Sequence, residues 1–187
     1  MPDAIVLLKN DHREVEKLFK KFEKLGDGAH TAKRAVVDQI IEELSVHAAI
    51  EEQHFYPAVR DADPEVEDDV LEGLEEHHIV KWVLSELQDL DPRNERFDAK
   101  VTVLIENVRH HVEEEEGEMF PAVRQVMGRK ALQELGELME KAKTVAPVRP
   151  HPKGPDEPPG NLVAGPASAA VDAVRDKVHT RLGRRTR

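Results

Sequence analysis

Two stretches of the chain repeat one another, and their polar content limits the folds that the chain can adopt. HAAIEEQHFYPAVR spans residues 47–60, and HVEEEEGEMFPAVR spans residues 111–124, 64 residues later. The two agree at the first His, at two successive Glu and at a closing Pro-Ala-Val-Arg. Since His and Glu are rarely buried without partners, a repeated run of them needs a physical explanation.

Helical spacing places the repeated His and Glu on the face that should be buried. In residues 31–60, three- and four-residue steps give an aliphatic seam that changes to His47 and Glu51. In residues 95–126 the same steps reach His111 and Glu115. Residues four apart lie above one another on a helix, so each pair presents an imidazole and a carboxylate inward. The full seams are Val37, Ile40, Leu44, His47, Glu51, His54 and Ala58, then Val101, Leu104, Val108, His111, Glu115, Glu118 and Ala122.

The segments that precede these two carry a matching repeat. DHREVEKLF at residues 11–19 aligns with EHHIVKWVL at residues 76–84, which pairs His12 with His77 and Val15 with Val80. In this register the inward residue is His77, and His78 points elsewhere. The sequence therefore predicts two copies of one helical hairpin, each of which brings two His and one Glu to the centre.

Helices are predicted over residues 3–25, 31–60, 64–90 and 95–126, followed by a shorter one over 129–143. Asp3, Thr31 and Asn94 are the predicted N-caps. Short connections between long helices favour antiparallel neighbours, and no segment alternates with period two. The predicted fold is all-α: an up-down-up-down four-helix bundle with a short fifth helix. Pro57 and Pro121 are expected to kink or end the second and fourth helices.

The charge balance changes near residue 145. Residues 145–187 carry eight basic and four acidic side chains, a net charge of +4. Because the formal net charge of the whole chain is −11, residues 1–144 carry a net charge of −15. Residues 1–144 are the predicted bundle domain, and residues 145–166 read as a Pro-rich extended linker. After the linker we expect a basic amphipathic helix that packs on the bundle or frays; an acidic partner for it is the alternative.

Composition excludes several classes of protein. There is no Cys, which rules out disulfides, iron–sulfur clusters and thiolate zinc sites. The apolar run at residues 4–8 is too short for a signal peptide, and no apolar stretch would span a bilayer. The acidic body disfavours nucleic acid as a partner. A cytoplasmic, soluble protein is the expectation.

A metal site explains why polar residues occupy the predicted core. A buried unpaired carboxylate costs several kcal/mol, and buried imidazoles also need partners. A cation supplies the missing charge and converts that cost into binding energy. Imidazole and carboxylate without sulfur suit iron, manganese or zinc. The predicted metal ligands are His12, His47, Glu51, His77, His111 and Glu115.

This order of ligands, one His, then HxxxE, then His, then HxxxE, resembles the hemerythrin-like HHE cation-binding domain over residues 3–126. The resemblance implies two iron ions with an oxo or hydroxo bridge, and manganese or zinc are less favoured. It implies that His12 and His47 bind one iron, that His77 and His111 bind the other, and that Glu51 and Glu115 bridge them.

The sequence departs from the oxygen-carrying hemerythrins at one position. Where those proteins have a fifth His, four residues after the first His of the third helix, this chain has Lys81. The site would then have an additional open position or take a ligand from elsewhere. His54 and its repeat mate Glu118 are predicted as an additional ligand or as outer groups. Tyr56, whose repeat mate is Phe120, is predicted to serve in packing rather than in redox chemistry.

A rival assignment is a ferritin-like di-iron carboxylate site, because Glu51–His54 and Glu75–His78 fit the E-x-x-H pattern. These two motifs fall on consecutive helices, which breaks the internal symmetry, so the HHE assignment is preferred. It leaves two classes of function. One is chemistry with a small oxidant or gas, such as peroxide disproportionation in an oxidative-stress or iron response. The other is an oxygen, nitric oxide or iron sensor or carrier without turnover.

Overall fold

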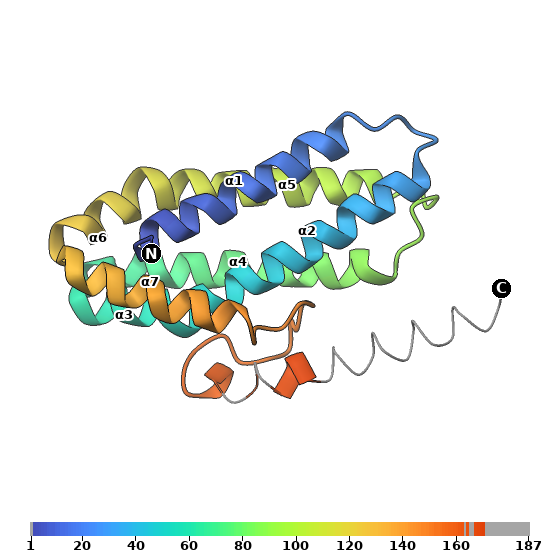
Figure 1. Cartoon of the computed structure of the whole chain (residues 1–187). Helices are drawn as coiled ribbons and strands as arrows, with labels where there is room; N and C mark the ends of the chain where they lie inside the picture. The colour runs from blue at the N-terminus through green and yellow to red at the C-terminus, as the bar shows by residue number, and fades with distance from the viewer. Residues whose placement is uncertain (1, 163, 165–166, 171–187) are drawn as a thin grey trace.

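The computed structural model describes residues 2–162, 164 and 167–170, and it forms an all-α bundle (Figure 1). The four long helical segments run up-down-up-down as predicted, and no strand occurs in the described residues. Their order is α1 (Ala4–Glu23), α2 (His30–Ile50) continued by η1 and α3, α4 (Glu67–Asp89), and α5 (Phe97–Glu114) continued by η3 and α6. The predicted fifth helix is α7 (Arg129–Lys143), which packs on α1 and α2.

Of the predicted N-caps, only Asp3 caps its helix, accepting a hydrogen bond from the Val6 backbone N–H at 2.8 Å. The Thr31 prediction is wrong, because α2 already begins at His30 and has no side-chain cap. The Asn94 side chain instead closes the preceding turn by accepting from the Arg96 N–H at 2.9 Å, and α5 begins later, at Phe97.

The two prolines do not end their helices, because a π-helical turn precedes each of them. Segment η1 (Glu51–Phe55) leads into α3 (Tyr56–Ala62), and η3 (Glu115–Met119) leads into α6 (Phe120–Val126). The Tyr56 N–H bonds the Glu51 carbonyl and the Phe120 N–H bonds the Glu115 carbonyl, both five residues back. A π turn inserts one extra residue into the helix and is common at functional sites. Both turns begin at a predicted ligand, Glu51 or Glu115.

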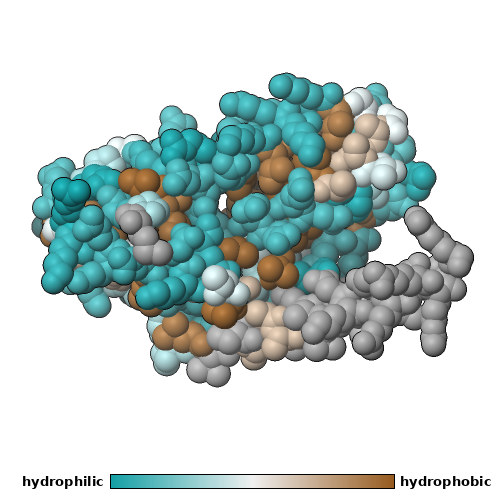
Figure 2. Space-filling view, in the orientation of Figure 1, coloured by the Kyte–Doolittle hydropathy of each residue, from teal (hydrophilic) through white to brown (hydrophobic). Residues whose placement is uncertain are grey.

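The hydrophobic core has two parts, with the polar residues between them. Toward the α1–α2 connection, one cluster is built around Phe19, Ile40, Leu84 and Phe97. At the other end, α7 completes a second cluster with Ile5, Leu8, Phe55, Phe120 and Met139. Burial on this scale, with each large aliphatic or aromatic side chain contributing about 1.5–3 kcal/mol, holds the ligand-bearing turns in place. The face in view is mostly hydrophilic, with smaller patches of hydrophobic residues among the polar ones (Figure 2).

Residues 145–162 lie against the bundle rather than extending away from it. Asn161 is buried and accepts a hydrogen bond from the Gln53 side chain through its carbonyl at 3.2 Å. Asp156 pairs with Lys81, and Glu157 lies 3.3 Å from Arg60. The predicted basic amphipathic helix falls largely on residues outside the described part of the chain. No described helix combines the length and apolarity needed to cross a membrane.

Candidate metal centre

The six predicted ligands meet at the middle of the bundle, and all of them are buried. His12 comes from α1, His47 from the end of α2, His77 from α4 and His111 from α5, while Glu51 and Glu115 open the two π-helical turns. Their ligating atoms form two groups in which all atoms lie within 4.8 Å of one another. The first contains His12, His47, Glu51 and Glu115; the second contains Glu51, His77 and His111.

Glu51 joins the two groups. Its Oε2 lies 3.0 Å from His47 Nε2 and 3.4 Å from His77 Nε2. Glu115 Oε2 lies 3.3 Å from His12 Nε2 and 3.6 Å from His111 Nε2. Each carboxylate thus faces one imidazole of each helical hairpin, and Glu51 is the carboxylate that belongs to both ligand groups.

Several of these buried atoms have no hydrogen-bond partner, which is the observation that tests whether a metal fits. Both Glu51 carboxylate oxygens, Glu115 Oε2 and His12 Nε2 accept or donate no hydrogen bond. A buried polar atom without a partner costs about 1–3 kcal/mol, and more when it is charged. Imidazole nitrogens and carboxylate oxygens turned toward a common point are ligands for iron, manganese or zinc. The residues present therefore fit a pair of such ions.

A carboxylate faces the outer nitrogen, Nδ1, of each of the four histidines. His12 donates to Glu116 at 2.9 Å, His77 to Glu52 at 3.0 Å and His111 to Glu76 at 2.7 Å. His47 Nδ1 lies 3.7 Å from Asp11, an ion-pair distance. Because an ionised carboxylate only accepts, each hydrogen-bonded Nδ1 carries the proton and leaves Nε2 free to ligate.

These four outer carboxylates were not predicted, although the sequence carries a signal for them. Each neighbours a ligand in the chain, as in Asp11-His12, Glu76-His77, Glu51-Glu52 and Glu115-Glu116. The successive Glu residues are among the few positions at which the two repeats agree. What the sequence could not show is that each carboxylate orients a histidine on a different helix.

His54 and Glu118 do not join either group, contrary to their predicted inward position. His54 is half-buried and Glu118 is exposed. The π-helical turns insert one extra residue after Glu51 and Glu115, so Phe55 and Met119 are buried where the three- and four-residue steps place His54 and Glu118. The ferritin-like E-x-x-H pattern is not assembled either, since Glu75 and His78 are also exposed.

The two repeats differ at a buried aromatic position near the predicted ligands, where the first has Tyr56 and the second has Phe120. Tyr56 is buried, donates its phenolic proton to Glu115 Oε1 at 3.0 Å, and lies 3.5 Å from His77 Nε2. Burial, with the nearby Glu115 charge, raises the pKa of Tyr56 well above its ordinary value. Phe120 instead stacks on His12, with ring centroids 5.9 Å apart. The surroundings of His77 and His12 therefore differ by one buried hydroxyl group.

Gly73 of α4 makes room for this hydroxyl. A Cβ at position 73 would lie 2.9 Å from the Tyr56 oxygen and 3.6 Å from His111 Cε1. Glycine costs a helix interior about 1 kcal/mol relative to alanine. The close approach of the phenol explains why that cost is tolerated here.

Gly73→Ala is expected to displace the Tyr56 phenol and to lower the melting temperature, because overpacking costs about 1–3 kcal/mol and exceeds the gain in helix propensity. Thermal unfolding of the metal-free protein measures this. Gly117→Ala is the matched control, since nothing lies within 4 Å of a Cβ there. Combining Gly73→Ala with Tyr56→Phe should restore part of the lost melting temperature, because the phenolic oxygen that the new Cβ would meet is then absent. Equal melting temperatures for the two alanine variants would contradict the steric assignment.

Lys81, at the position of the absent fifth His, does not face the ligands. Its ammonium group is buried and lies 3.0 Å from the carboxylate of Glu52, which in turn accepts from His77. Asp156 of the C-terminal segment is its second partner. Lys81 therefore acts through Glu52 on the orientation of His77, and within the described residues no nitrogen replaces the fifth His.

In the metal-free protein the carboxylates hold two histidines protonated. Burial alone would lower the pKa of His47, but Glu51 and Asp11 outweigh burial and raise it to about 10. Burial is likewise outweighed at His77, where Glu51 and Glu52 raise the pKa to about 9. The same pairs keep the pKa of Glu51 well below its ordinary value despite its burial.

The metal-free protein is expected to lose stability as the pH rises from about 6.5 to 10. Since the folded-state pKa values exceed the ordinary value, the histidinium pairs stabilise the fold fully below pH 6.5 and are lost through pH 9–10. A loss of only ~2 kcal/mol would lower the melting temperature by about 5 °C. The metal-loaded protein, whose ligands are neutral imidazoles, is the control. If the melting temperatures of the metal-free and metal-loaded proteins fell equally with rising pH, the loss could not be assigned to the histidinium pairs.

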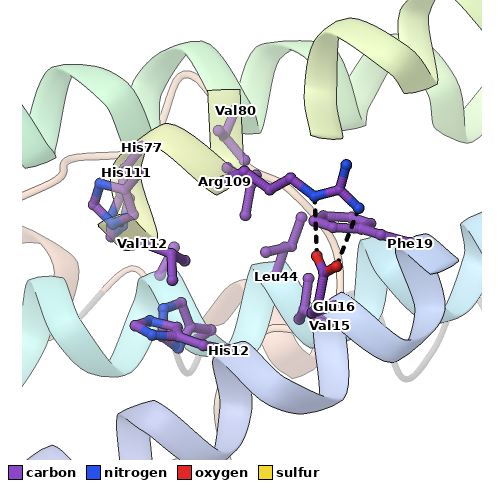
Figure 3. Close-up of a pocket in the computed structure, with 13 residues that line it drawn as sticks. His12, Val15, Glu16, Phe19, Leu44, His77, Val80, Arg109, His111 and Val112 are labelled. Carbon is purple, nitrogen blue, oxygen red and sulfur yellow. Dashed lines mark hydrogen bonds and ion pairs between the residues drawn. The ribbon is translucent and has the colours of Figure 1, made fainter. Parts of the chain in front are cut away.

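An apolar cavity of about 290 Å³ adjoins the four histidines (Figure 3). In the close-up, His77 and His111 face His12 across the bundle, and Arg109 reaches Glu16 beside Phe19. Arg109 Nε lies 3.0 Å from Glu16 and Nη1 lies 2.8 Å from Glu23, so its charge is neutralised. The apolar lining consists of Val15, Phe19, Leu44, Ala48, Val80, Val108 and Val112.

Comparison with known proteins agrees with this geometry. Residues 3–123 match the family model described as the Hemerythrin HHE cation binding domain. An uncharacterized hemerythrin-like protein of Schizosaccharomyces pombe is 28% identical over 167 residues, covering 89% of this chain and 81% of that protein. A Nostoc protein named DNA nickase is 30% identical over 118 residues, which cover 63% of this chain but only 32% of that protein.

A solved structure supports the same assignment. The crystal structure of a hemerythrin HHE cation binding domain-containing protein from Mycobacterium kansasii superposes with a TM-score of 0.65 at 26% identity, covering 77% of this chain and 89% of that one. The family match spans well over half of the sequence and includes all six ligand positions. This chain therefore belongs to the hemerythrin HHE cation-binding domain family.

Proposed function

We propose that this protein holds two iron ions and reacts there with a small oxidant or gas: peroxide, oxygen or nitric oxide. The observation that carries the proposal is the pair of ligand groups that share Glu51 and adjoin an apolar cavity. His12, His47, Glu51 and Glu115 would hold one ion, and Glu51, His77 and His111 the other. Two iron ions supply redox equivalents and open coordination positions for a small ligand.

The protein's own residues prepare this site in two ways. Glu116, Glu52 and Glu76 fix the Nδ1 proton on His12, His77 and His111, so that each Nε2 faces the centre. Tyr56 holds a proton 3.0 Å from Glu115, where it can hydrogen-bond an incoming oxygen ligand. Tyr56 contacts Glu115 of the first group and lies 3.5 Å from His77 of the second, whereas Phe120 stacks on His12, so the two ions are expected to differ in reactivity.

The cavity suits a small neutral ligand. An apolar cavity of roughly 150 Å³ is enough for benzene, so about 290 Å³ admits peroxide, oxygen or nitric oxide. Its lining is mostly Val, Leu and Phe, and apolar side chains beside the ligands strengthen electrostatic interactions there. With Lys81 in place of the fifth His, one ligand position would be left open, which favours peroxide chemistry over reversible oxygen carriage. A role in oxidative stress would follow from such a reaction.

Peroxide decay by the iron-loaded protein tests this proposal. In disproportionation, two peroxide molecules give two water molecules and one dioxygen, so oxygen evolution accompanies the decay. We expect turnover above that of the metal-free protein, with a change in near-ultraviolet absorption. A spectral change with oxygen or nitric oxide but no turnover would instead favour a sensor or carrier. The proposal fails if the iron-loaded protein responds to none of the three.

A further inference from the structure

A second opening, chemically unlike the apolar cavity, leads to the metal centre. It is an acidic cleft of about 60 Å³ between α4 and the end of α5 with η3. No Lys or Arg lines it in the part of the chain that the structure describes. Five carboxylates surround it: Asp69, Glu72, Glu76, Glu114 and Glu118.

The floor of the cleft is formed by two predicted ligands, His111 and Glu115. Glu115 is only 2% exposed, and its Oε2 accepts no hydrogen bond. The cleft thus joins an anionic surface to a buried carboxylate oxygen that accepts no hydrogen bond. This second observation distinguishes it from an ordinary acidic patch, since a buried carboxylate oxygen without a hydrogen bond favours a cation.

A third group of ligating atoms lies at the rim. Atoms of Glu76, His110 and Glu114 lie within 4.8 Å of one another, and His110 Nε2 is 3.3 Å from Glu114. The group is accessible, because His110 is exposed and the two Glu are only partly buried. Glu76 also accepts from His111 Nδ1 at 2.7 Å, so one carboxylate belongs to both the rim and the centre.

The two openings differ in what they admit. A hydrated cation entering the apolar cavity would lose water against Val, Leu and Phe side chains before it met the histidines, which is costly. In the cleft, carboxylates replace water stepwise, and their summed potential concentrates cations at the mouth. A space of about 60 Å³ holds a cation that keeps a water or two.

We propose that the acidic cleft is the route by which divalent cations reach the metal centre, and that Glu76, His110 and Glu114 hold the cation on its way in. This inference rests on the proposed two-ion centre. The apolar cavity then serves the small oxidant, and the cleft serves the metal.

The rate of Co²⁺ loading tests the route. Co²⁺ is mixed with metal-free protein at low ionic strength, and its visible absorption is followed as imidazole and carboxylate replace water. Asp69→Asn/Glu72→Gln removes two rim charges without touching a ligand. Loading is expected to slow at least about fivefold, with the final stoichiometry unchanged, and the difference should vanish near 1 M salt. The control is Asp27→Asn/Glu137→Gln, which removes the same two charges at exposed positions that do not line the cleft.

Equal loading rates for the cleft and control variants would overturn the route. Equilibrium titration with Co²⁺ tests the rim group of Glu76, His110 and Glu114. The wild type should bind a third, weakly held Co²⁺ per chain, and the His110→Gln variant should not. A wild type without that equivalent would overturn the holding group. If no variant binds Co²⁺ at the centre, the two-ion proposal fails together with this inference, whereas full loading at unchanged rates refutes the route alone.

Discussion

Replacing both His47 and His111 with alanine is expected to abolish metal binding. His47 belongs only to the first ligand group and His111 only to the second, so the double variant removes one imidazole from each. Metal content should fall from about two ions per chain to background, and the stabilisation that the metal gives to the folded state should disappear. Elemental analysis and thermal unfolding with and without metal measure the two effects.

The matched control is His54→Ala/His78→Ala, which also removes two histidines close to ligands in sequence. Neither residue belongs to a ligand group, so this variant should bind metal as the wild type does. Equal metal content in wild type and the His47/His111 variant would refute the assignment. Loss of metal in the control would show that His54 or His78 ligates after all.

Glu51→Gln is expected to have the largest effect of any single substitution at the centre. Glu51 is completely buried between His47 and His77, so a neutral amide removes the negative charge that both imidazoles share. Each histidine then keeps only its outer carboxylate, Asp11 for His47 and Glu52 for His77. Breaking a buried ion pair costs about 3 kcal/mol, or roughly 10 °C in melting temperature for a chain of this size. Metal content should fall as well, because Glu51 belongs to both ligand groups.

Glu115→Gln provides the sharpest comparison with that variant. Glu115 belongs to the first group only, so its variant should keep an ion at Glu51, His77 and His111. Metal titration and unfolding of the two variants side by side measure the difference. Glu115→Gln losing as much metal and as much stability as Glu51→Gln would contradict the central position of Glu51.

The sequence predicted the bundle and the convergence of six candidate ligands because both depend on local periodicity. Four long amphipathic segments with short connections have few ways to pack, and a seam aligned over two repeats identifies its inward residues. His12, His47, Glu51, His77, His111 and Glu115 follow from that spacing alone. Their burial agrees with it.

The details beyond Glu51 and Glu115 could not be predicted, because helical spacing changes there. One extra residue per π-helical turn rotates His54 and Glu118 off the seam and turns Tyr56 and Phe120 toward the ligands. Contacts between helices were equally hidden, such as Glu52 orienting His77 and Lys81 binding Asp156, which lies 75 residues away. These depend on the packed structure, and no local pattern encodes them.

The most direct test of the two-ion centre is an anomalous difference map from crystals of the iron-loaded protein, collected at the iron absorption edge. The ligand groups predict two peaks, one among His12, His47, Glu51 and Glu115 and the other among Glu51, His77 and His111. A single peak, or peaks that lie outside these residues, would contradict it.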